Sequence, residues 1–166
     1  LEKAVELGGE WLHDTILTGP AAEAAFARVL SQQKLNMEQQ FIQQGNVYAA
    51  TRAGAHYTVD GAVSERCSGV SYYKFLCGVQ ERGNWAALSE KLDALRTEVL
   101  QHAQLTVSLH GSEDALARLR TLLPESRFAA EGRAAARPYT EPLTPPVNEA
   151  FIIDGGVNYD VLVWPM

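Results

Sequence analysis

The chain has 166 residues, of which 46% are hydrophobic and 20% are charged; this is typical of one ordinary globular domain, or of one and a fraction. Twenty acidic residues against 14 Lys and Arg give a formal net charge of -6. Because the basic residues are dispersed and lack neighbouring aromatic residues, nucleic acid is not expected as a partner. No apolar run approaches the roughly 18 residues that cross a bilayer, and no signal peptide is recognisable. We therefore expect no membrane partner and a place in the cytoplasm or inside an organelle.

Helical periodicity covers the first part of the chain. Apolar residues recur at helical spacing over residues 2–17, and residues 18–20 (Thr-Gly-Pro) mark a break and a new start. The pattern over residues 21–55 is long enough for two helices, which would meet near residues 32–36 or at Gly45. The sequence therefore predicts an early cluster of helices.

Further helical segments follow. Residues 63–80 are expected to form one helix that is interrupted at Gly69. Asn84 is expected to cap the next helix, and Ser112 to cap a short helix that ends near Leu123. Most of the predicted regular structure is thus helical.

Strand patterns are confined to the second half of the chain. Apolar and polar residues alternate over residues 105–109, and residues 150–153 and 157–164 are rich in β-branched and aromatic residues. Residues 124–147 contain five of the seven prolines and are expected to be a linker or long loop. The sequence therefore predicts the α+β class, a helix-rich domain with a few strands.

The residues that could bind a metal are scattered. Cys67 and Cys77 lie ten residues apart in one expected helix, where they cannot pair, and we expect reduced structural thiols. The segment from His110 to Asp114 comes near the metallopeptidase motif H-x-x-E-H, but Asp114 stands where the second histidine should be. The four histidines are His13, His56, His102 and His110. We predict no metal ligand, no cofactor and no catalytic residue in this chain, and substrate-binding residues stay unassigned.

Two groups of residues between 64 and 75 allow a functional and a structural interpretation. Ser64 and Glu65 could be catalytic, but a serine before a helix with a glutamate in the first turn is typical of a helix cap. Tyr72, Tyr73 and Phe75 could line a peptide groove, but aromatic residues at this density are more often core residues. Helical spacing places Tyr72 and Phe75 on one buried face, with Tyr73 pointing elsewhere. We favour the structural interpretation in both cases.

An ordered series of short motifs resembles the insulinase-type (pitrilysin superfamily) zinc metallopeptidases, in particular the branch of the presequence protease and falcilysin. The motifs span nearly the whole chain in the order of that branch, with departures at residues 154–156 and at Asp160. The matching segments are Met37-Glu38, Gly45–Ala49, Arg52–Tyr57, Ser64-Glu65, Ser68–Leu76, Asn148–Ile153 and Val157–Tyr159.

The resemblance implies a place in a larger enzyme. Such peptidases consist of two halves that close around a chamber, with the zinc motif in the first domain. Residues 1–123 would be the helix-rich part of the peptidase-associated third domain, residues 124–147 a linker, and residues 148–166 the first strands of the fourth domain. The chain would then be a non-catalytic piece of the C-terminal half of a zinc-dependent metalloendopeptidase.

The resemblance also implies the partners. These are the N-terminal catalytic half of the parent polypeptide, which carries the zinc, and through it peptide substrates. Residues 150–164 would lack their neighbouring strands, and we expect self-association there. The alternative is a helical protein-interaction module, or a segment of an inactive peptidase homologue.

Overall fold

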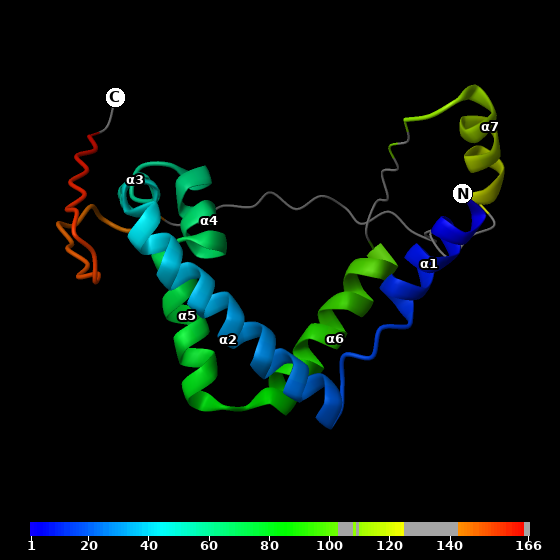
Figure 1. Ribbon diagram of the computed structural model, residues 1–166, viewed down its shortest axis with the longest axis horizontal. Helices are drawn as coiled ribbons and strands as arrows, with labels where there is room; N and C mark the ends of the chain where they lie inside the picture. Colours follow the sequence, from blue (N-terminus) through cyan, green and yellow to red (C-terminus); the bar gives the residue numbers. More distant parts are fainter. Residues whose placement is uncertain (103–107, 109, 125–142, 165–166) are drawn as a thin grey trace. The chain divides into compact units, whose positions relative to one another are not determined.

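The computed structural model describes residues 1–102, 108, 110–124 and 143–164 of the chain. Nearly all of the strand predicted for residues 105–109, and most of the loop predicted for residues 124–147, lie outside these residues. Regular structure in the described part consists of seven α-helices (Figure 1). They are α1 (Glu2–His13), α2 (Pro20–Gln43), α3 (Gly45–Gly54), α4 (Val59–Ser68), α5 (Val70–Arg82), α6 (Trp85–His102) and α7 (Glu113–Leu122).

Local sequence signals explain several of the helix boundaries. Gly19 adopts a positive φ of 90° and is followed by Pro20, whose fixed φ suits the first residue of α2. Gly83 is left-handed, with φ 60°, and ends α5. Ser112 Oγ accepts a hydrogen bond of 3.3 Å from the Ala115 N–H at the start of α7. The predicted breaks at residues 18–20 and the Ser112 cap are therefore confirmed.

The helix predicted for residues 63–80 is two helices that meet at Gly69, and the first of them begins earlier than predicted. Thr58 caps α4, because its Oγ1 accepts a 3.0 Å hydrogen bond from the Gly61 N–H. Ser64 and Glu65 consequently lie late in α4. The prediction that Ser64 caps a helix, with Glu65 in its first turn, is wrong.

The predicted α+β class is wrong as well, since no strand occurs in the described part of the chain. Residues 150–153 and 157–164 form no ladder, and the one backbone hydrogen bond found among residues 143–164 joins Gly155 N to Ile153 O at 3.0 Å. A β-rich composition favours an extended backbone, but a strand also needs a neighbouring chain to bond with. The described fold is helical.

The chain divides into two compact units. Unit 1 comprises residues 1–23 and 85–137, with α1, α6 and α7. Unit 2 comprises residues 24–84 and 138–166, with most of α2 and all of α3, α4 and α5.

In unit 1, α6 is tied to the segment that follows α1. The Ser89 side chain is 1% exposed, and its hydroxyl donates to the carbonyl of Leu17. Arg96 Nη1 donates to the carbonyl of Thr15 and Nη2 to Asp93 at 2.5 Å. These bonds satisfy carbonyls that lie beyond the end of α1, where no helical partner is available.

In unit 2, α3 packs against α4 and α4 against α5. Side-chain bonds connect α2 with α5, from Lys34 to Gln80 and from Tyr73 to Glu38, each at 2.6 Å. Because the earlier residue of α2 meets the later residue of α5, these two helices run antiparallel. The buried apolar residues on these helices are Leu30, Met37, Ala62, Val70, Leu76 and Val79.

Candidate functional site

The densest polar network in the described part of the chain centres on Arg52, in the last turn of α3. Its Nε and Nη2 donate to the two carboxylate oxygens of Glu149 at 2.5 and 2.8 Å. Its Nη1 lies 3.1 Å from Ser71 Oγ and 3.4 Å from Glu65 Oε1. A guanidinium is suited to this arrangement because its rigid fork of N–H groups can bind one carboxylate with two parallel bonds. We refer to these four residues as the Arg52 network.

Glu65 connects the Arg52 network to the junction of α4 and α5. Its side chain is 3% exposed, and its Oε1 accepts a 2.8 Å hydrogen bond from the Ser71 N–H in the first turn of α5. A carboxylate at this place satisfies an N–H without a helical partner and interacts favourably with the helix dipole. Glu65 Oε2 has no hydrogen-bond partner among the described residues. Glu65 thus caps α5 from the end of α4.

The charges of the Arg52 network stabilise each other. The hydrogen bonds from Arg52 hold the pKa of Glu149 below its ordinary value of 4.5, and the same bonds raise the pKa of Arg52. The side chains of Arg52 and Glu149 are 22% and 28% exposed. Because the pair is partly shielded from water, its attraction is screened less than that of a surface ion pair.

Glu149 belongs to a stretch, residues 143–164, that lies along the helices of unit 2 and that we term the strap. Its start is held by His56, a residue 8% exposed, whose Nδ1 lies 3.2 Å from the carbonyl oxygen and 3.0 Å from Oγ1 of Thr144. Lys74 Nζ on α5 lies 5.1 Å from the ring centroid of Phe151, a cation–π contact. Charged and aromatic side chains therefore fix the first half of the strap.

The second half of the strap contacts the start of α3 and the end of α2. The ring of Tyr159 lies against the backbone of Gly45, and its hydroxyl donates to the carbonyl of Ile42 at 3.2 Å. The Tyr57 hydroxyl donates to the carbonyl of Val163 at 3.4 Å. Side chains, and not a ladder of backbone bonds, thus attach the strap to unit 2.

The aromatic residues of α5 differ from the prediction. Phe75 is 56% exposed, whereas Tyr73 is half-buried and its ring meets Phe41 edge-on, with 5.2 Å between the ring centroids. Tyr48 meets the other side of this group, 4.6 Å from Phe41. The predicted helix phase is therefore wrong at this point, and Tyr73 takes the structural role expected of Phe75.

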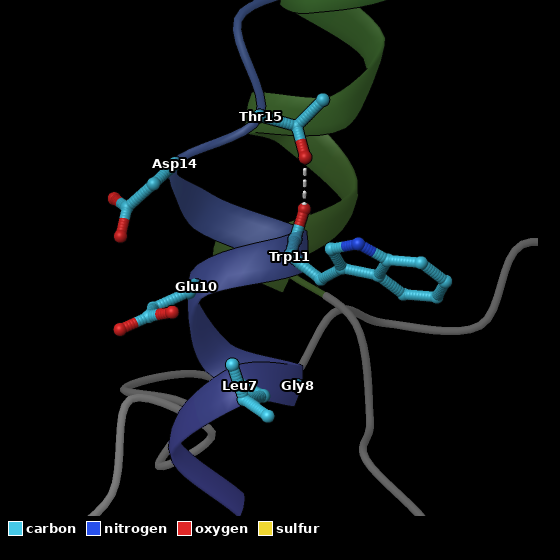
Figure 2. Close-up of a pocket in the computed structure, with 6 residues that line it drawn as sticks. All are labelled: Leu7, Gly8, Glu10, Trp11, Asp14 and Thr15. Carbon is cyan, nitrogen blue, oxygen red and sulfur yellow. Dashed lines mark hydrogen bonds between the residues drawn. The ribbon is translucent and has the colours of Figure 1, made fainter. Parts of the chain in front are cut away.

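The described part of unit 1 has a shallow pocket of about 500 Å3 along one helix, α1 (Figure 2). Leu7 and the exposed Trp11 supply most of its apolar surface, with Glu10, Asp14 and Thr15 beside them. The Thr15 hydroxyl donates to the Trp11 carbonyl at 2.5 Å. An open depression on one helix encloses too little of a small ligand to be a binding site.

The described residues contain no group of three or more His, Cys, Asp or Glu that could hold a metal ion. His13 ends α1, His56 is engaged with the strap, and His110 lies before α7. Cys67 and Cys77 are free and lie in two successive helices, α4 and α5, and not in one as predicted. None of the helices seen in the described ranges has the length and apolar character to cross a membrane.

The residues of the Arg52 network coincide with the motifs that carried the family resemblance, and the comparison with known families agrees. Residues 1–79 match the family model of the peptidase-associated segment found in subfamily C of the M16 peptidases. This confirms the predicted resemblance: the chain is a peptidase-associated segment of the M16 family.

Individual relatives have the same character. The chain is 29% identical over 147 residues to presequence protease 1, chloroplastic/mitochondrial, of Arabidopsis thaliana, a match that covers 81% of this chain and 13% of that protein. It is 23% identical over 112 residues to Protein HypA of Clostridium perfringens, covering 68% of this chain and 11% of that protein. The chain thus spans only about an eighth of the length of these relatives. No solved structure matches it significantly.

The sequence alone did not reveal what the matching motifs do. Arg52, Glu65 and Ser71 were recognisable as parts of a family pattern, but their contact with Glu149 joins residues 97 positions apart. The His56–Thr144 contact was also missed, because neither residue stands in a motif with a chemical signature. The signal that could have found the ion pair is the charge pattern, one arginine in the helix motif and one glutamate in the later motif.

Proposed function

We propose that the chain is a non-catalytic structural part of a zinc-dependent metalloendopeptidase that degrades peptides in an enclosed chamber. It would form the wall opposite the zinc and help to exclude folded proteins by size. The observation that carries this proposal is the match to the peptidase-associated family over residues 1–79, together with the presequence protease relative. The Arg52 network supports the non-catalytic role, because its groups pair with each other and hold the strap.

The exposed apolar side chains support a partner that covers them. Trp11 is 84% exposed, Ile16 is 79% exposed and Ile152 is fully exposed. Large apolar side chains in contact with water are favourable sites for packing against another surface. We propose that this partner is the N-terminal catalytic half of a longer polypeptide, which would bring the zinc and the peptide substrates.

The proposed arrangement places residues 1–123 in the peptidase-associated third domain and residues 148–166 at the beginning of the fourth, with residues 124–147 between them. No cofactor is proposed for the chain itself. We propose that the parent enzyme acts in the cytoplasm or inside an organelle, with neither nucleic acid nor membrane as a partner.

The test uses the longest natural polypeptide that contains this chain. After dialysis it should retain one zinc ion per molecule by elemental analysis and cleave an unstructured peptide in a chelator-sensitive reaction, while sparing a folded protein of similar sequence length. The isolated chain should do neither. A polypeptide that binds no zinc and cleaves nothing would contradict the peptidase proposal.

A second candidate function is a helical protein-interaction module, or a segment of an inactive homologue. The wholly helical described fold and its exposed apolar residues favour it. An H-x-x-E-H helix upstream in the same polypeptide would decide for the peptidase. The module would instead retain a protein partner without any zinc.

We also propose that the isolated chain self-associates through residues 150–164. Leu162 is 86% and Trp164 is 71% exposed, on an extended segment whose backbone groups can pair with a second chain. Light scattering should show concentration-dependent dimers, which Leu162→Lys weakens and Leu95→Lys, at an exposed position on α6, does not. A chain that stays monomeric at all concentrations would contradict self-association.

A further inference from the structure

The strap is attached to unit 2 at a few separate side chains. Thr144, Glu149, Phe151 and Tyr159 provide its contacts with the helices. Between and beyond them the strap is open to solvent, and Ile152 is fully exposed. Because no backbone ladder joins the strap to the helices, its attachment depends on these individual contacts.

Glu149 makes the strongest of them. It receives two short hydrogen bonds from one guanidinium, whereas the other contacts are a cation–π interaction, a ring against a glycine and single neutral hydrogen bonds. Charge-assisted bidentate pairs are roughly twice as strong as neutral hydrogen bonds. The strap should therefore come loose when this pair is broken.

We propose that the Arg52–Glu149 pair is a latch for the strap, and that Arg52 couples the strap to the α4–α5 junction through Glu65. The nitrogens Nε and Nη2 hold the strap, while Nη1 faces the buried Glu65 and Ser71. The inference concerns this chain alone and does not depend on the proposed peptidase activity.

The two sides of the latch are unequal, and this makes the proposal specific. When Glu149 is neutralised, Arg52 still faces the carboxylate of Glu65, so the helices keep their charge balance. When Arg52 is neutralised, the Glu65 carboxylate, 3% exposed, is left without its cation. An unpaired buried charge is costly. Loss of Glu149 should thus release the strap alone, whereas loss of Arg52 should also loosen the start of α5.

Limited chymotrypsin digestion of the full chain, followed by mass spectrometry, separates these effects. Cleavage after Phe151 and Tyr159 reports on the strap, and cleavage after the exposed Phe75 reports on α5, because native cleavage follows the population of the open state. In Glu149→Gln, strap cleavage should rise about tenfold or more, with cleavage after Phe75 nearly unchanged.

Substitutions at Arg52 test the coupling. In Arg52→Gln both cleavages should rise, and the Ser71 amide resonance should shift because its bond to Glu65 is disturbed. Arg52→Lys keeps a charge beside Glu65 but lacks the fork that binds Glu149, so it should release the strap and spare α5. This variant and Glu149→Gln carry the test if Arg52→Gln fails to fold.

The control is Glu6→Gln, which removes an exposed ion pair with Lys3 on α1 and should change neither cleavage. Unchanged strap cleavage in Glu149→Gln would overturn the latch. Equal increases after Phe75 and Phe151 in Glu149→Gln would overturn it too, because the pair would then stabilise the whole unit. Strap release in Arg52→Gln without any change at Ser71 or Phe75 would overturn the coupling.

Discussion

The ring of Tyr159 rests on the backbone of Gly45 at the first residue of α3. A Cβ at position 45 would overlap this ring, with ring carbon Cε2 2.6 Å away, so only glycine permits the approach. Gly45→Ala should therefore displace Tyr159 and loosen the second half of the strap. Chymotrypsin cleavage after Tyr159 should increase several-fold.

Gly54 provides the matched control for this substitution. It lies in the same helix, and a Cβ there would meet no atom within 4 Å. Because alanine is the better helix former, Gly54→Ala should leave the strap in place and stabilise the chain by up to about 1 kcal/mol. If both variants behave alike, the contact between Tyr159 and Gly45 does not hold the strap.

A second prediction concerns Gly69, where α4 meets α5. A Cβ at this position would overlap the Glu65 carboxylate and lie 2.9 Å from the Glu65 Cα. Gly69→Ala should cost about 1–3 kcal/mol in the free energy of unfolding, as overpacking does, measured by urea denaturation. Gly78→Ala, within α5, meets the flexible end of Arg82 at 3.3 Å and should be neutral or slightly stabilising. A neutral Gly69→Ala would show that the junction is not closely packed.

The third prediction concerns pH. The bonds from Arg52 lower the pKa of Glu149 in the folded chain, so the ionised form favours folding. The contribution of Glu149 should be complete above its ordinary pKa of 4.5 and be lost as the pH falls through the lowered folded pKa. The difference in unfolding free energy between the natural chain and Glu149→Gln should be constant near neutral pH and shrink in this acidic range. A difference that does not change with pH would exclude a charge-based contribution.

The fourth prediction compares the two aromatic residues of α5. Tyr73 packs edge-on against Phe41 and donates a 2.6 Å hydrogen bond to Glu38, a contact that raises its pKa. Phe75 is mostly exposed. Tyr73→Ala should thus be more destabilising than Phe75→Ala by at least about 1 kcal/mol, and Phe75→Ala should stay within about 0.5 kcal/mol of the natural chain.

Tyr73→Phe separates the ring from the hydroxyl in this comparison. It keeps the contact with Phe41 and should cost about 1 kcal/mol, the contribution of the hydrogen bond alone. Denaturant unfolding measures all three variants. A larger loss in Phe75→Ala than in Tyr73→Ala would restore the helix phase predicted from the sequence.

The sequence by itself determined the features that depend on neighbouring residues. The break before Pro20, the division at Gly45, the interruption at Gly69 and the cap at Ser112 were all predicted. In each case a proline, a glycine or a serine hydroxyl acts within a few residues along the chain. The ordered motifs also identified the family, because they depend on residue identity and not on contacts.

Only the tertiary structure decided what the remaining residues do. The strand prediction for residues 150–153 and 157–164 rested on composition, but strand formation requires a bonding neighbour, and here the extended segment lies on helices. Glu65 was placed at the start of a helix, whereas it lies near the end of α4 and caps α5. Arg52 binds Glu149 and faces Glu65 through a rigid guanidinium fork. Such a pairing depends on three-dimensional proximity between distant parts of the chain, which no local pattern of residues encodes.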